Sequence, residues 1–299
     1  MKEYVNKLKL FFYASLSLTL ICAILRTLSI FTAFDTKVDY FFADALLPKI
    51  HLALIVVSLL FFSFLFVLIP RKSLPVFCPF GSSMDSFASA SCGFVYMISM
   101  VMLYLTMKQN MNLISYAIII SGIFAAIFFI IDAFTASSSL ITTKILLSMC
   151  VAANILLLIV REYMNYYLAI NAPNKLLFFL SFASFAVFII QSIKFKVDAA
   201  SPRLFVCSAL FSGLLCSASA IPGMICHYGK VLSDSTFLIY YFINLVFALY
   251  SFTKLNSYVK FVAIIPKISL ELENTESSEE LAEVKAEERE EEASSETKS

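Results

Sequence analysis

The chain has 299 residues, of which 60% are hydrophobic and only 14% are charged. A soluble domain usually has ~45–50% apolar and ~25% charged residues, so the composition excludes an ordinary water-soluble fold. The formal net charge of +1 hides a division: residues 1–270 hold 19 Lys and Arg against 9 acids, whereas residues 271–299 hold 3 against 12.

Eight separate stretches, each of 16 residues or more, lack Asp, Glu, Lys and Arg. A helix rises ~1.5 Å per residue and a bilayer core is ~30 Å thick, so each stretch spans it or nearly does. Strands of membrane barrels are shorter and alternate in polarity, which excludes a barrel. The sequence therefore predicts an all-α, polytopic transmembrane bundle of about 8 spans, within a range of 7 to 9.

The first apolar run follows Lys2, Lys7 and Lys9, an arrangement also seen in secretory signals. No small-x-small cleavage site follows it, and Ile21 before Cys22 does not fit a lipoprotein signal. We expect this run to be retained as the first helix.

In chain order, the hydropathy pattern predicts eight spans separated mostly by short connections. Their expected bounds are Leu10–Ala33, His51–Ile69, Ser86–Met107, Leu113–Ile131, Thr142–Val160, Leu176–Ile193, Leu204–Cys226 and Thr236–Thr253. Short connections predict that consecutive helices pack as antiparallel neighbours.

The basic residues of the connections predict the orientation, because cytoplasmic loops retain Lys and Arg. With the N-terminus inside, the inner segments hold 12 basic residues and the outer loops hold 6. Both termini are therefore expected in the cytoplasm. The absence of N-x-S/T acceptors favours a bacterial inner membrane.

The composition divides the chain into three regions: a transmembrane domain over residues 1–255, a juxtamembrane segment over 256–270 and an acidic tail over 271–299. The tail is too polar to form a core, which predicts a disordered cytoplasmic segment. A solvated tail is the favoured interpretation, and docking of a protein partner is the alternative.

Charged residues inside apolar spans are the best pointers to a site, because an ionised group there costs at least ~2.5–3.5 kcal/mol. Arg26 lies in the outer half of the first span, while Asp132 and Lys144 lie near the inner surface. We expect Arg26 to extend to the outer headgroups and Lys144 to the inner ones. The alternative is a buried Arg26 that binds an anionic ligand.

The seventh span contains small residues at steps of four, Ala209, Gly213 and Ser217, followed by Pro222 and Gly223. Small residues on one face allow close helix packing. Pro222-Gly223 is expected to end the helix. The alternative is a helix break whose freed carbonyls bind a solute, with Arg26 in the same ligand-binding region.

No pattern in the chain predicts catalysis, a cofactor, a metal or a nucleic-acid partner. Only two histidines occur, with no HExxH, no G-x-S-x-G and no phosphate-binding glycine loop among six glycines. Asp35, Asp39 and Asp44 are expected to be hydrated loop residues and not cation ligands. We therefore predict a protein without enzymatic activity.

Four short motifs near the N-terminus are Leu25-Arg26-Thr27, Phe34-Asp35, Tyr40-Phe41-Phe42 and Leu47-Pro48. In their order and spacing before a second apolar span, they resemble uncharacterised multipass proteins of anaerobic Gram-positive bacteria. The resemblance covers about the first fifth of the chain. It implies a polytopic membrane protein and no particular activity.

Two functions remain open from the sequence. The favoured one is a membrane component such as a sensor or a complex subunit, whose partners are the lipid bilayer and, at the tail, a protein. The other is a small-solute permease with its binding region around Arg26 and Pro222-Gly223. A polar cavity near the midplane would favour the permease, and a solidly packed bundle the first function.

Overall fold

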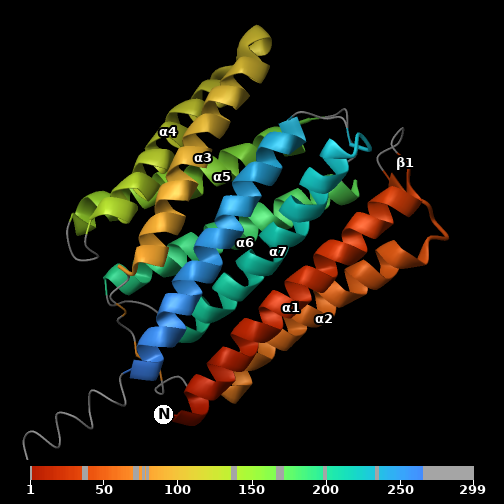
Figure 1. Cartoon of the computed structure of the whole chain (residues 1–299). Helices are drawn as coiled ribbons and strands as arrows, with labels where there is room; N and C mark the ends of the chain where they lie inside the picture. Colours follow the sequence, from red (N-terminus) through yellow and green to blue (C-terminus); the bar gives the residue numbers. More distant parts are fainter. Residues whose placement is uncertain are drawn as a thin grey trace, which may run out of the picture.

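The computed structural model describes residues 2–35, 40–69, 74–75, 78, 81–135, 140–165, 172–197, 201–232 and 236–264. Within these ranges the chain is a helical bundle with eight helices long and apolar enough to cross a membrane, as Figure 1 shows. The predicted fold class is confirmed.

The helices are α1 (Lys2–Ala33), α2 (Leu46–Leu68), α3 (Ser83–Met107), α4 (Leu113–Phe134), α5 (Ile141–Tyr163), α6 (Pro173–Lys196), α7 (Pro202–Tyr228) and a last helix, Thr236–Ile264. A short 3₁₀ turn, η2 (Lys108–Asn110), follows α3. Strands β1 (Phe34–Asp35) and β2 (Tyr40–Phe41) form an antiparallel pair after α1, with Phe34 opposite Phe41.

Local sequence signals explain several helix starts. Ser82 and Asp85 form a reciprocal capping box at the start of α3. The Asn112 side chain accepts a hydrogen bond from the Ser115 amide at the start of α4. Pro173 and Pro202 occupy the first turns of α6 and α7, where a missing amide hydrogen costs nothing.

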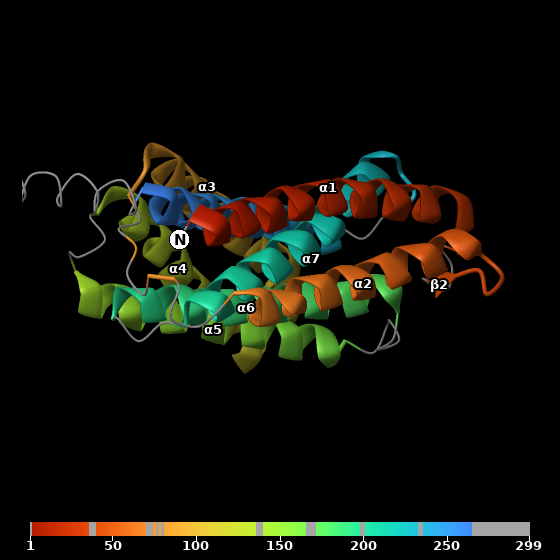
Figure 2. The ribbon, with the colours of Figure 1, turned by 90° about the horizontal axis from the view of Figure 1, so that it is seen from below.

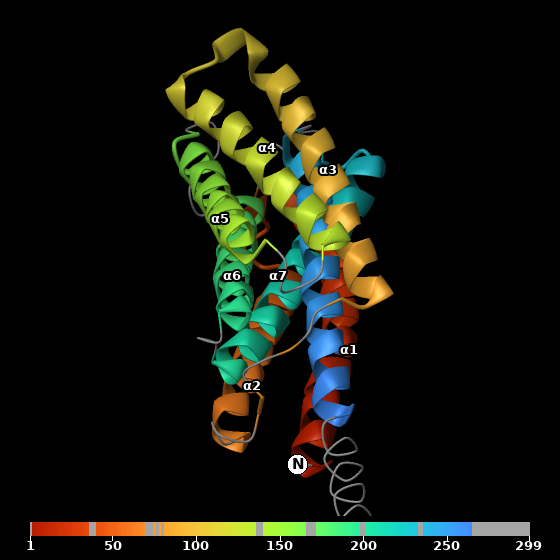
Figure 3. The same cartoon turned by 90° about the vertical axis from the view of Figure 1, so that its left-hand side faces the viewer.

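The last helix and α7 form the centre of the bundle. Within their most apolar windows, 83% of α7 and 67% of the last helix are buried, against 33% of α1 and 22% of α2. Figures 2 and 3 show α7 flanked by α1, α2 and α6, in agreement with its contacts. The exposed apolar side chains of the outer helices suit a lipid environment.

The predicted order of neighbours is correct for most consecutive helices and wrong at one connection. α2 packs against α1 and α7, whereas α3 packs against α4 on the other side of the bundle (Figure 1). The connection between them is long and rich in proline, so it can cross the end of the bundle. Its Pro75 carbonyl accepts a hydrogen bond of 3.0 Å from the Tyr258 hydroxyl of the last helix.

The last helix extends beyond the predicted end at Thr253 and runs to Ile264. The segment predicted as juxtamembrane therefore begins as helix, up to residue 264. The acidic tail, 271–299, lies outside the described residues. The N-terminus and the end of the last helix lie at the same end of the bundle (Figure 1), here called the N-terminal end.

The prediction that Pro222-Gly223 ends the seventh helix is wrong. α7 continues through Pro222 to Tyr228. Proline removes one amide donor, but an unpaired backbone group in lipid is so unfavourable that membrane helices continue through proline. A Cβ built on Gly223 would lie 2.5 Å from the Tyr241 ring, so Gly223 allows the last helix to approach α7 closely.

The predicted packing role of the small residues in α7 is confirmed at Gly213. A Cβ at this position would lie 2.6 Å from the Phe252 ring of the last helix. Ala209 and Ser217 are buried in the same helix. Close contact between α7 and the last helix therefore depends on two glycines, Gly213 in the first half of α7 and Gly223 in the second half.

Candidate functional site

Charged side chains gather inside the bundle at both of its ends. At the end opposite the N-terminus, Arg26 lines a cavity that we call the Arg26 pocket. At the N-terminal end, Asp132, Ser89, Tyr250 and Lys254 form a group that we call the Asp132 cluster.

The Arg26 side chain is packed within the protein, and the expectation that it extends to the headgroups is wrong. Only 5% of the residue is exposed. Its Nη2 donates a hydrogen bond of 2.7 Å to Oδ1 of Asn174 in α6, and its guanidinium lies 5.9 Å from the centre of the Phe41 ring. The guanidinium is thereby fixed between α1, α6 and β2.

The Arg26 pocket is a cavity of about 280 Å³ between α1, α2 and α6. Its polar side is formed by Arg26, Lys49 and His51, and the rest of its lining is apolar. His51 is 4% exposed, and its Nε2 has no hydrogen-bond partner among the described residues. Neither Pro222 nor Gly223 lines this pocket, so the three predicted site residues do not share this cavity.

The fold also directs two helix starts to this pocket. Ala45 and Pro48 at the start of α2 and Pro173 at the start of α6 are part of its lining. Ala45 and Ala172 occupy the cap positions of these helices, and their side chains cannot accept a hydrogen bond from the first turn. The start of a helix carries partial positive charge, because its first amides point out of the helix.

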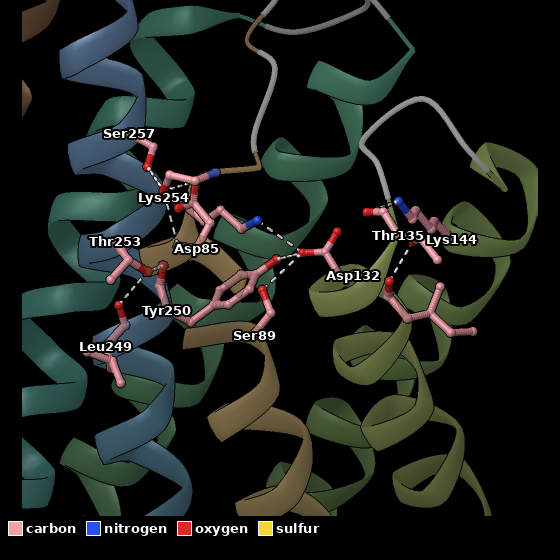
Figure 4. A network of polar contacts seen from close by, with 12 residues as sticks. Asp85, Ser89, Asp132, Thr135, Lys144, Leu249, Tyr250, Thr253, Lys254 and Ser257 are labelled. Atoms are coloured by element: carbon pink, nitrogen blue, oxygen red, sulfur yellow. Dashed lines mark hydrogen bonds and ion pairs between the residues drawn. The ribbon is translucent and has the colours of Figure 1, made fainter. Parts of the chain in front are cut away.

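The Asp132 cluster contains a buried ion pair between α4 and the last helix (Figure 4). Lys254 Nζ lies 3.0 Å from Oδ2 of Asp132, and both side chains are only 4% exposed. The same oxygen accepts hydrogen bonds from the Ser89 hydroxyl at 3.3 Å and the Tyr250 hydroxyl at 3.2 Å. These contacts connect α3, α4 and the last helix.

One further charged residue, Asp85, and a buried thiol, Cys78, lie beside this cluster. Asp85 is 1% exposed, and its Oδ1 has no partner within the described ranges. Burial raises the pKa of the nearby Cys78 thiol to about 12, the Asp85 carboxylate adds to the rise and the Lys254 ammonium opposes it. Positive and negative groups therefore alternate across this end of the bundle.

The expectation that Lys144 reaches the inner headgroups is wrong. The residue is completely buried at the start of α5, and its Nζ donates to the Thr135 carbonyl at 3.4 Å (Figure 4). Like Arg26, it is satisfied by protein groups and not by headgroups.

A second polar group connects α5, α6 and the last helix at the end opposite the N-terminus. The Tyr240 hydroxyl donates to Glu162 Oε1 at 2.9 Å and accepts from Arg161 Nη1 at 2.7 Å. Lys175, which is fully buried, donates to the Asn165 carbonyl at 2.8 Å. These contacts cross-link helices and line no cavity described for this part of the chain.

The described residues contain no group of three or more His, Cys, Asp or Glu side chains placed to hold a metal ion. Asp35 lies in β1 and Asp44 is exposed in the turn before α2, while Asp39 lies outside the described residues. In the described ranges these carboxylates therefore form no cluster of metal ligands.

Several functional candidates escaped the sequence analysis. Asn174, His51, Lys254 and Tyr250 are ordinary residues until the fold brings them to Arg26 or Asp132. One local signal existed, because Tyr250 and Lys254 are four residues apart and share a helix face if the last helix continues past Thr253.

Comparison of the chain with protein-family models, with curated proteins and with solved structures finds no match. The fold itself defines the class, a multipass helical membrane protein whose buried charged side chains lie at the two ends of the bundle. The resemblance of the first fifth of the chain to multipass proteins of anaerobic Gram-positive bacteria stays a prediction.

Proposed function

We propose that this chain is a non-enzymatic component of the cell membrane, a sensor or a subunit of a larger membrane complex, with both termini in the cytoplasm. The orientation follows from the twofold excess of basic residues in the segments assigned to the inside. The proposal favours a static bundle over one that opens a path for solutes.

The observation that carries this proposal is the packing at the middle of the bundle. The rings of Phe185 in α6 and Phe247 in the last helix stack with centres 3.6 Å apart, and Tyr96 of α3 lies 5.6 Å from Phe247. These side chains are fully buried. Aromatic rings packed in this way fill the space that a midplane solute site would require.

Polar groups at the middle of the bundle are used for helix–helix contacts. Asn154 of α5 accepts a hydrogen bond from the Tyr96 hydroxyl and donates to the Ile118 carbonyl and the Ser121 hydroxyl of α4. Between α7 and the last helix, the hydroxyls of Ser212 and Ser251 are 2.9 Å apart. Interhelical hydrogen bonds of this kind stabilise membrane bundles.

A permease remains the second candidate because Arg26 lines a cavity. That cavity lies at one end of the bundle. Arg26 is seven residues before the end of α1 at Ala33, which is about 10 Å along the helix axis at about 1.5 Å per residue. The proposed break at Pro222-Gly223, which would have completed a solute site, is absent from α7. The geometry thus supports ligand binding more than passage.

Reconstituted vesicles test this proposal. We expect the purified protein to leave the flux of chloride, nitrate and phosphate at the level of protein-free vesicles. A higher flux that Arg26→Gln removes and Lys108→Gln preserves would place Arg26 on a permeation path and overturn the proposal. Lys108 is a suitable control because it is exposed at the same end of the bundle and does not line the pocket.

A further inference from the structure

Among the residues that the structure describes, the lining of the Arg26 pocket includes two basic side chains, Arg26 and Lys49, and no carboxylate. Arg26 and His51 are buried, while Lys49 is exposed at the rim. The guanidinium donates to Asn174 and keeps its positive charge beside the cavity. A buried His51 nitrogen without a partner in the described ranges supplies a further polar atom beside the cavity.

The two uncapped helix starts add to this charge. The first turns of α2 and α6 place partial positive charge at the pocket, because their early amides lack intrahelical acceptors. The helix starts, the Arg26 guanidinium and the Lys49 ammonium therefore favour the same sign of ligand, an anion.

The remaining walls favour an acyl chain. Leu52 and Ile55 of α2 and Leu177 and Leu180 of α6 line the cavity on the side away from the helix starts. From Pro173 to Leu180 the wall runs about 10 Å along the helix axis. Leu52 is 58% exposed and Leu180 44%, so the open side of the cavity faces the surrounding hydrocarbon.

We propose that the Arg26 pocket binds a membrane lipid with an anionic headgroup. The phosphate or carboxylate would lie between Arg26 and His51, and part of an acyl chain would lie between α2 and α6. The inference goes beyond the proposed function, which depends on the packed middle of the bundle. Lipid binding at this pocket is independent of it, because a permease could hold a lipid at the same place. Basic pockets between membrane helices bind anionic headgroups on the same physical grounds.

The absence of tryptophan from the chain provides a clean assay. Phe42 lines the pocket and is 55% exposed, so Phe42→Trp places a single fluorophore at its rim. Brominated phosphatidylglycerol, added to the protein in detergent, should quench this tryptophan at concentrations about tenfold or more below those of brominated phosphatidylcholine. A hydrogen bond to a charged group supplies a difference of this size.

Variants show whether the preference belongs to the pocket. Arg26→Gln and His51→Gln should each reduce the preference for phosphatidylglycerol several-fold, and Lys108→Gln, which removes a charge from the same end of the bundle, should leave it unchanged. Native mass spectrometry of lipid retained by the chain without the reporter gives a second measurement. If Arg26→Gln fails to fold, the lipid retained by His51→Gln is compared directly with that retained by the unmutated chain.

Three results would overturn the proposal. Equal quenching by the two lipids would show that the headgroup charge is not recognised. A preference unchanged in both Arg26→Gln and His51→Gln would place the lipid elsewhere. Loss of the lipid on addition of inorganic phosphate at millimolar concentration would show that the pocket takes its anion from water. None of these results depends on solute flux.

Discussion

The buried ion pair of the Asp132 cluster should make a large contribution to stability that depends on both partners. Replacing Asp132 with Asn keeps the size of the side chain and an oxygen that can still accept from Ser89 and Tyr250. The substitution therefore removes the negative charge and little else. Lys254 is left as a buried ammonium without the Asp132 carboxylate.

The size of the effect follows from the geometry. Two unit charges 3.0 Å apart attract by about 5 kcal/mol at an effective dielectric constant of about 20. Removing one partner of a buried pair typically costs ~3–5 kcal/mol, because the other charge stays desolvated. We therefore expect Asp132→Asn to lower the free energy of unfolding by about 3 kcal/mol or more.

Unfolding by SDS in mixed micelles measures this change. Lys254→Met should cost a similar amount, whereas the double variant Asp132→Asn/Lys254→Met should cost much less than the sum of the two, since neither charge of the pair is then buried without the other. Lys260→Met is the matched control, because Lys260 lies on the same helix and is exposed. A loss below about 1 kcal/mol for Asp132→Asn, or additive losses in the double variant, would refute the buried pair.

Three further predictions concern packing and orientation. Gly223→Ala forces a methyl group into a tyrosine ring of the last helix and should cost about 1–3 kcal/mol, whereas Gly81→Ala, with open space around it, should be neutral by the same unfolding assay. Asn154→Leu removes three interhelical hydrogen bonds of ~0.6 kcal/mol each on average and should cost roughly 2 kcal/mol; an unchanged midpoint would contradict its role. An impermeant maleimide should label Lys108→Cys in intact cells and Lys194→Cys only after permeabilisation, with the wild-type chain as background; the reverse pattern would invert the orientation.

The fold was predictable because hydropathy acts along the chain. Each predicted span falls on a helix, since apolar runs that lack charge have no favourable alternative in lipid. The ends were underestimated where a charged residue stood inside the helix. Lys254 seemed to end the last span, yet it is buried because Asp132 neutralises it.

The site was only partly predictable. Arg26 stood out as a charge in an apolar run, which a single sequence can show. Its acceptor, Asn174, is 148 residues away in the chain, and nothing local marks it. The predictions that Arg26 and Lys144 extend to the headgroups were wrong for the same reason. Their protein acceptors come from other parts of the chain and become visible only in the folded structure.

The central position of the last helix has a consequence for how the protein is made. Tyr250, which donates to Asp132, is translated 118 residues after it, and at about 5–20 residues per second this interval lasts roughly 6–24 seconds. During that time α4 is already synthesised, while its carboxylate lacks both the Tyr250 hydroxyl and the Lys254 ammonium. A chain that stops before residue 254 therefore contains the Asp132 carboxylate without the Lys254 ammonium that pairs with it in the complete bundle.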